Sequence, residues 1–460
     1  MKKFKSFFSK VDIKKLLIIL FIIALIPPLF SFILQDHDLP LLADEIDYSQ
    51  LATDILEGRG FYCETLRSGF IKMPHIRHPL YPFFISIIYF FSNNSIVVVK
   101  LAQILIHALT CLIILLIANR LFKNRIISFC SGMAWALYPL AISHALLLIS
   151  ETLFTFLLCT SILFILKYTQ PGKVKNGFFS GLFLGLAILT KSFILLFMPI
   201  LFLWFILVVK ETISKKTMGF SILVFFMLLT ISPWIIRNNI VLGKPFFIAS
   251  GGGHSFYRYN NEMTLDVIDT PLRIAFPFTD EQKKKISSLS EQDVDKYLSG
   301  LGWQFMRSNP QDFFKIRLNE LCNFWHLWPS SPNKFSEYYL KHKADENIKD
   351  VFLDRSLDGF INRFKSSYWL YFLKILYHAP YNVLFLGMFA SLFLGLKKDR
   401  MVWKNSLLLF LLILFFNIIY IFHHGSDRYR LPIDPYVFML GFYGITLFIR
   451  SLRENNDKSA

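Results

Sequence analysis

The chain has 460 residues, of which 54% are hydrophobic and only 18% are charged. A water-soluble domain of this length needs more polar surface, so the composition excludes an ordinary soluble enzyme and predicts a membrane protein with several spans. The net charge is +17, but the basic residues fall in short clusters between apolar runs. That distribution is typical of the cytoplasmic loops of membrane proteins and argues against nucleic-acid binding.

Apolar segments of about 20 residues predict an all-α, polytopic bundle of membrane-spanning helices. The first segment follows a basic tail and is too long for the core of a signal peptide, so we expect it to remain as an uncleaved first span. Lys191 alone separates two of the segments. The ten predicted spans are 16–35, 96–118, 126–147, 151–167, 177–190, 192–209, 218–236, 371–396, 405–423 and 433–450.

The distribution of Lys and Arg predicts the orientation of these spans. With the N-terminus in the cytoplasm, every predicted cytoplasmic loop is basic, and the C-terminus is cytoplasmic as well. Segments 36–95 and 237–370 are then extracytoplasmic. We therefore expect an N-terminal catalytic module (1–236), an extracytoplasmic loop region (237–370), and C-terminal helices with a tail (371–460).

The extracytoplasmic segments contain two shorter helical patterns. Residues 79–91 are apolar but too short to span comfortably, so we expect a helix along the membrane interface. Residues 312–328 carry apolar side chains at helical spacing, and Trp325 and Trp328 suit a position at the interface. Cys63 and Cys322 are both on this side, which leaves a disulfide and two thiols as open alternatives.

Acidic residues gather directly after the first span, in LADEIDYSQLATDILEGRG (42–60). In a helix, Asp44, Asp47 and Asp54 lie on one stripe. A favourable helix dipole accounts for Asp44 and Glu45 but not for Asp54, which favours a functional cluster. Glu151 is a second candidate, at the extracytoplasmic end of its span, although a first-turn acid after an N-capping serine explains it equally well.

Cations on this same side break the positive-inside pattern. Guanidinium groups bind phosphate through two parallel hydrogen bonds, so they suit an anionic lipid headgroup or a substrate phosphate. Ordinary contact with membrane lipids is the alternative, and it suffices for Arg237. The candidate substrate-binding residues are Arg77, Lys191, Arg237, Arg428, Tyr429 and Arg430.

Acids and phosphate-binding cations on one membrane surface predict chemistry on a phosphate-linked lipid. An acid can deprotonate an acceptor hydroxyl, and arginines can stabilise a departing phosphate. This combination predicts sugar transfer from a polyprenyl-phosphate donor. His75 and His78 lie near the acids, but no spacing fixes a metal geometry, so a divalent metal cofactor stays open.

The sequence resembles bacterial membrane glycosyltransferases of the GT-C fold, related to protein O-mannosyltransferases and lipid A aminoarabinose transferases. The matching segments occur in the family's order: DEIDYSQLATDILEGRGF, IRHPLYPFFIS, SETLFTFLL, LTKSFILLFMP, PWIIRNNIVLGKPFFIASGG and HGSDRYRLPIDP. The chain departs from the family at Lys191, where many members have Arg, and at His78, where many have Pro.

The resemblance implies an inverting enzyme that uses undecaprenyl- or dolichyl-phosphate sugars outside the cytoplasm. It implies that Asp44 is the catalytic base or the acid that orients the acceptor, with Glu45 beside it and Glu151 as the second acid. It also implies that Arg428, Tyr429 and Arg430 hold the phosphate. The acceptor is a glycan, a lipid or a protein. A flippase for lipid-linked sugars and a polysaccharide polymerase or ligase are the alternatives.

Overall fold

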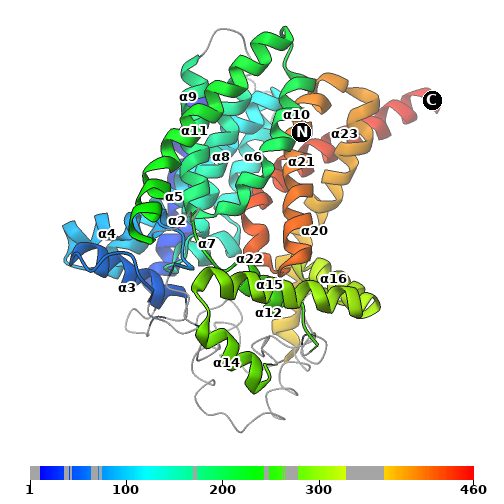
Figure 1. The fold of residues 1–460 in the computed structure, drawn as a ribbon. Helices are drawn as coiled ribbons and strands as arrows, with labels where there is room; N and C mark the ends of the chain where they lie inside the picture. The colour runs from blue at the N-terminus through cyan, green and yellow to red at the C-terminus, as the bar shows by residue number, and fades with distance from the viewer. Residues whose placement is uncertain are drawn as a thin grey trace.

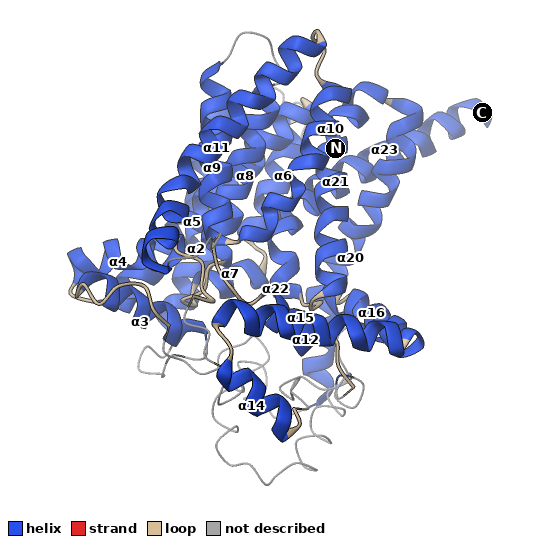
Figure 2. Cartoon of the chain, in the orientation of Figure 1, coloured by secondary structure: helices blue, strands red, loops and turns tan. Residues whose placement is uncertain are grey.

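The computed structural model describes residues 11–35, 41, 44–63, 71, 75–168, 174–242, 248–262, 264, 278–327 and 367–459. The elements formed by these residues are helices, and most of them run side by side in one bundle (Figures 1 and 2). This confirms the predicted all-α membrane architecture. Trp328 lies outside the described residues.

Seven helices in the described ranges are long and apolar enough to cross a membrane. They coincide with seven of the predicted spans. They are α2 (Ile13–Leu34), α5 (Ile96–Phe122), α8 (Glu151–Tyr168), α11 (Ile213–Leu242), the later part of α20 (Ser367–Lys398), α21 (Arg400–Phe422), and the run from α22 (Asp427–Arg430) through η3 (Leu431–Ile433) into α23 (Asp434–Ser459).

The other three predicted spans are helical but are not single long helices. Segment 126–147 forms α6 (Arg125–Ala136) and α7 (Pro139–Ala145), which meet at 53°. The bend falls at Tyr138, which is extended as expected before a proline. Segments 177–190 and 192–209 form α9 (Val174–Thr190) and the pair η1 (Ser192–Phe197) and α10 (Met198–Val208). These are shorter apolar helices, separated by an extended Lys191.

Among the described residues, four helices form a layer that covers one end of the bundle, and α23 ends at the opposite end (Figure 1). This helical layer consists of α12 (Gly252–Arg258), α14 (Asp280–Ser288), α15 (Glu291–Ser308) and α16 (Pro310–Trp325). Helices α3 (Asp44–Leu56) and α4 (Leu80–Ser92) lie beside the bundle near the same end. Helix α4 has the 13-residue length expected of an interfacial helix, and its Phe90 and Phe91 are exposed.

Close helix contact holds the C-terminal part of the bundle together. A Cβ atom added at Gly444 of α23 would lie 1.8 Å from the carbonyl oxygen of Gly387 on α20. Only glycine permits this approach, which is a common device where membrane helices pack. Among the described cysteines, Cys63 is buried, Cys322 is exposed, and the two form no disulfide.

Candidate active site

Helix α3 begins with the acidic cluster and turns it toward the end of the bundle that carries the helical layer. Asp44 and Asp47 lie in the first helical turn, where the helix dipole favours negative charge. The Asp47 side chain is 1% exposed, whereas that of Asp44 is 28% exposed. Asp44 is therefore the acid of this pair that a substrate can reach.

Arg77 joins these two acids from the loop before α4. Its Nη2 donates to Asp44 Oδ1 at 2.5 Å and to Asp47 Oδ2 at 2.6 Å, and its Nε donates to Asp47 Oδ2 at 2.9 Å. The guanidinium also lies 5.1 Å from the centre of the Tyr48 ring, an attractive cation–π distance. The structure thus brings Arg77 to the predicted catalytic acid.

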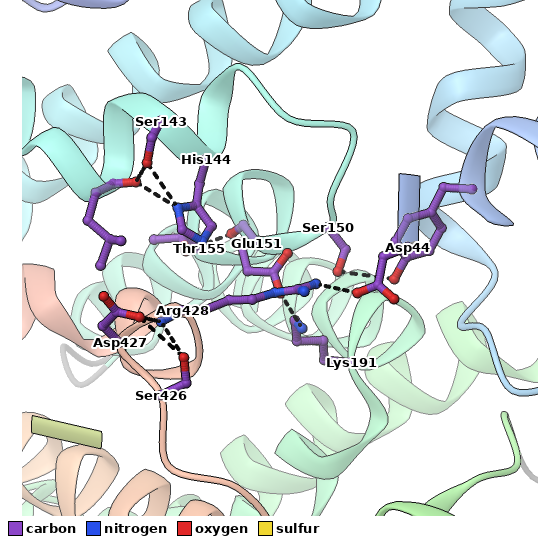
Figure 3. Close-up of polar contacts among 12 residues, drawn as sticks. Asp44, Ser143, His144, Ser150, Glu151, Thr155, Lys191, Ser426, Asp427 and Arg428 are labelled. Carbon is purple, nitrogen blue, oxygen red and sulfur yellow. Dashed lines mark hydrogen bonds and ion pairs between the residues drawn. The ribbon is translucent and has the colours of Figure 1, made fainter. Parts of the chain in front are cut away.

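Arg428 of α22 bridges the two predicted catalytic acids, which are 107 positions apart in sequence, as Figure 3 shows. Its Nη2 lies 2.8 Å from Asp44 Oδ2, and its Nε donates to Glu151 Oε1 at 2.7 Å. Lys191 donates to the same Glu151 oxygen at 3.1 Å. Glu151 is the first residue of α8 and is fully buried. Its Oε2 has no hydrogen-bond partner among the described residues.

This ion-pair network contains equal numbers of opposite charges. Burial acts to raise the pKa of Asp44, but the guanidinium groups of Arg77 and Arg428 outweigh it and hold that pKa well below its usual value. Asp44 is therefore a carboxylate at neutral pH, with both oxygens engaged by arginine. The acids are Asp44, Asp47 and Glu151, and the cations are Arg77, Lys191 and Arg428.

Glu45 and Tyr429 flank the network. Glu45 is 3% exposed, and its Oε1 accepts a hydrogen bond from the backbone N–H of Leu148 at 2.9 Å, which joins α3 to the loop before α8. Tyr429 stacks on Tyr420 at 4.8 Å between ring centres. Lys191 Nζ and Arg428 Cζ each lie 5.7 Å from the centre of the Tyr429 ring. Tyr429 therefore forms a wall beside both cations.

Arg430 was expected to share the phosphate with Arg428, but the structure separates the two. Arg430 is 3% exposed and its Nε donates to Asp434 at 2.9 Å. Its other nitrogens donate to Tyr138 Oη and to the backbone oxygens of Phe324 and Trp325. With its donors occupied inside the protein, Arg430 joins the last span to the helical layer and does not face Asp44.

Arg237 also lies apart from the network and lines a cavity of about 480 Å³. The cavity is mainly apolar and lies between α3, α4, α9 and α11, with Arg237 as its charged lining residue. The guanidinium lies 4.8 Å from the centre of the Trp234 ring. The lining residues are Ile55, Gly58, Gly60, Phe61, Pro79, Leu80, Phe83, Leu189, Thr230, Pro233, Trp234 and Arg237.

Two glutamates of the helical layer hold the segments that carry the arginines, and the sequence pattern did not single them out. Glu291 of α15 accepts from His75 N–H at 3.0 Å and contacts His75 Nδ1 at 2.8 Å, two residues before Arg77. Glu320 of α16 is fully buried and accepts from Gly425 N–H at 2.6 Å, three residues before Arg428. Both partners are distant in sequence, so no local spacing reveals them.

A metal ion has no candidate set of ligands among the residues that the structure describes. Within the described ranges, no group of three or more His, Cys, Asp or Glu side chains is arranged to hold a metal ion. The carboxylates of the network face guanidinium and ammonium groups instead. His75, one of the two histidines considered for a metal, contacts Glu291, and the other, His78, contacts Ser192.

Comparison with known proteins supports the sequence resemblance. Residues 74–236 match the family model described as dolichyl-phosphate-mannose-protein mannosyltransferase. Among curated proteins, no sequence matches the chain significantly.

Solved structures resemble the whole chain at low sequence identity. The oligosaccharyltransferase of Archaeoglobus fulgidus in its apo form aligns with 99% of this chain at a TM-score of 0.55 and 11% identity. The archaeal oligosaccharyltransferase AglB from Archaeoglobus fulgidus, in complex with an inhibitory peptide and a dolichol-phosphate, aligns with 98% of this chain at a TM-score of 0.54 and 12% identity. The chain spans about half, 52%, of the length of these proteins.

ArnT from Cupriavidus metallidurans bound to undecaprenyl phosphate aligns with 93% of this chain and 77% of its own, at 14% identity and a TM-score of 0.42. The likeness to the archaeal enzyme covers nearly every residue of this chain and thus extends well beyond the segment matched by the family model. The chain therefore has the GT-C fold of membrane glycosyltransferases, and residues 74–236 match the model of the dolichyl-phosphate-mannose-protein mannosyltransferase family.

Proposed function

We propose that the protein is a glycosyltransferase that moves a sugar from a polyprenyl-phosphate donor to an acceptor on the outer face of the plasma membrane. The observation that carries this proposal is the bridge from Asp44 through Arg428 to Glu151, next to further cations at one end of the bundle. A reactive acid beside several phosphate-binding groups is the combination that such a transfer requires.

The apolar cavity is the proposed site for the first isoprene units of the donor. Its walls include α4, which has exposed aromatic residues, and the apolar helix α11, and its mainly apolar lining suits a lipid chain. Leu189 lines it two residues before Lys191, and Pro79 lines it two residues after Arg77. A chain in the cavity therefore brings its phosphate to the cations of the network.

Arg77, Lys191 and Arg428 are the proposed phosphate-binding residues. Each is paired with a carboxylate in the empty protein, and a phosphate competes for the same donors. When the phosphate takes up donors of Arg77 and Arg428, the positive charge that depresses the pKa of Asp44 is partly neutralised. Donor binding thereby increases the basicity of Asp44 before the acceptor is attacked.

Asp44 is the proposed base because it is partly exposed, whereas Glu151 is fully buried. The acceptor oxygen attacks the anomeric carbon on the face opposite the phosphate and gives its proton to Asp44. The bond from that carbon to the phosphate oxygen breaks, and its electron pair stays on the phosphate. A single displacement of this kind inverts the anomeric centre. Glu151 then serves to orient Arg428 and Lys191.

The acceptor is proposed to approach from the side of the helical layer. The described helices of this layer, α12 and α14 to α16, cover the end of the bundle near α3, the helix that begins with Asp44 (Figure 1). Glycan, lipid and protein hydroxyls all satisfy the proposed chemistry. The topology that follows from the basic loops puts this end outside and both termini in the cytoplasm.

One incubation distinguishes this function from the two alternatives. Purified protein in liposomes is given a radiolabelled polyprenyl-phosphate monosaccharide and a cell-envelope extract. A transferase forms a new glycoside and releases polyprenyl phosphate. A flippase only moves label between leaflets, and a polymerase or ligase requires a diphosphate-linked oligosaccharide. Label that changes leaflet without forming a glycoside contradicts the proposal.

A further inference from the structure

His78 lies where two charged segments of the candidate active site meet. Its Nε2 is 2.9 Å from Ser192 Oγ, which joins the loop before α4 to the break between α9 and η1. Arg77, which pairs with Asp44, directly precedes His78, and Lys191, which pairs with Glu151, directly precedes Ser192. The imidazole therefore connects both halves of the ion-pair network.

The same histidine borders the apolar cavity. Pro79 and Leu80, the two residues after His78, line the cavity from the start of α4. Leu189, three residues before Ser192, lines it from the end of α9. A lipid chain in the cavity that directs its phosphate to the network passes this contact. His78 is thus at the boundary between the apolar and the charged part of the site.

The charges that act on His78 are positive. Burial lowers the pKa of His78, and the ammonium of Lys191 and the guanidinium of Arg77 lower it further. The Arg77 charge comes from its own loop, and the Lys191 charge comes from the α9–η1 break packed against it. Without an added anion the imidazole is neutral, and a bound phosphate adds a negative charge that favours the imidazolium.

We propose that His78 is a proton-linked contact for the donor phosphate, neutral in the empty protein and protonated when the phosphate binds, so that its imidazolium donates to a phosphate oxygen. This inference rests on the proposed function, because it presumes a phosphate-linked lipid. It adds a residue to the phosphate site that the ion-pair network alone does not identify.

The charge balance of the transfer explains how a protonated His78 assists the reaction. The donor is a phosphodiester with one negative charge, and the released carrier is a phosphate monoester with up to two, because its second pKa is about 6. The second charge appears on the oxygen that leaves the sugar. An imidazolium beside that oxygen stabilises the charge as it develops, and the proton it carries is taken from solvent when the donor binds.

Proton uptake on binding provides the test. Isothermal titration calorimetry is run at pH 6 in two buffers of different ionisation enthalpy. The probe is a short polyprenyl phosphate methyl diester, which carries no group that titrates near this pH. Any proton taken up therefore enters the protein. We expect wild-type protein to take up about one proton per diester bound, falling as the pH rises above the pKa of His78 in the complex.

Two variants assign that proton to a residue. His78→Gln is expected to bind the diester more weakly and to take up no proton. His423→Gln is the matched control, because His423 contacts Ile419 O at the end of α21 and is expected to leave the uptake unchanged.

The possible failures are distinguishable. Wild-type protein that binds the diester without proton uptake overturns the role of His78, even if the variant does not fold, and so does equal uptake by His78→Gln. Either result leaves the transferase proposal intact. Wild-type protein that does not bind the diester at all contradicts the proposed function itself.

Discussion

Asp44→Asn tests the candidate active site most directly, because it removes a charge while it retains the shape of the side chain. Asp44 lies 2.5 Å from Arg77 Nη2 and 2.8 Å from Arg428 Nη2. Opposite charges about 4 Å apart attract by about 4 kcal/mol near a protein surface, but desolvation offsets much of this. Arg77 retains Asp47, and Arg428 retains Glu151. We therefore expect the free energy of unfolding to fall by only about 1–3 kcal/mol.

The same change is expected to remove transfer activity almost completely. A positioned general base contributes about 10²- to 10⁴-fold to a rate, and asparagine cannot accept the acceptor's proton. The assay is release of polyprenyl phosphate from a labelled polyprenyl-phosphate monosaccharide at saturating donor. We expect kcat to fall by that factor, with the thermal midpoint in detergent lowered by only a few degrees.

Asp54→Asn is the matched control on the same helix. Asp54 is 6% exposed and, like Asp44, it accepts from an arginine, with Arg59 Nη2 at 2.6 Å and Gln50 Nε2 at 2.9 Å. We expect a comparable loss of stability with normal activity. Near-normal turnover in Asp44→Asn would refute the assignment of the base. Equal loss of activity in both variants would show that α3 matters only for folding.

Four further outcomes follow from named contacts. Glu320→Gln weakens the hydrogen bond from Gly425 N–H, so that Arg428, three residues later, shifts. We expect the rate of labelled-sugar transfer to fall about tenfold or more, with membrane insertion unchanged. Arg430→Met leaves Asp434 without its cation, and we expect a loss of about 3–5 kcal/mol in detergent unfolding but an unchanged donor KM in the folded fraction. Phe83→Asp adds a charge to the cavity and is expected to raise KM for a long-chain donor more than for a short-chain one. The pKa of Asp44 is lower in the folded protein than its unfolded value of about 3.8. The ion pairs of Asp44 therefore stabilise the protein above that pH and lose this effect as the pH falls below it. We expect the difference in unfolding free energy between wild type and Asp44→Asn to be constant from about pH 5 to 8 and to shrink below about pH 4.

Apolar length was sufficient to predict the membrane-spanning helices, because lipid imposes a direct requirement on it. The predicted division at Lys191 is present, because α9 ends at Thr190 and Lys191 is extended. Apolar length could not predict that segment 126–147 bends by 53°. The ammonium of Lys191 donates to Glu151 Oε1 at 3.1 Å, a contact between distant segments that apolar length does not predict.

Helical spacing predicts one acidic stripe on α3, but in the structure the acids of that stripe have different partners. Asp54 shares a helix face with Asp44, but it lies ten residues later and so about 15 Å farther along the axis. At that distance it cannot join the same network, and it pairs with Arg59 beyond the end of the helix. Periodicity gives the face of a helix on which a residue lies, but partners are determined by position along the axis as well.

The Arg428–Tyr429–Arg430 element shows the same distinction at shorter range. Two residues that are two positions apart on a helix differ by a rotation of about 200° about the helix axis. Arg428 and Arg430 lie on the helix α22, so their side chains point in nearly opposite directions and cannot bind one phosphate together. The structure directs Arg428 to the acids and Arg430 to Asp434.

Because this element supplies one guanidinium, the remaining donors for a phosphate have to come from elsewhere. Among the described residues, Arg77 and Lys191 pair with the same acids as Arg428, and they belong to the two segments that His78 and Ser192 join. Phosphate binding is therefore expected to depend on how three separate parts of the chain are held together. Substitution of Glu291 or Glu320 should weaken phosphate binding, although neither residue is a proposed phosphate ligand.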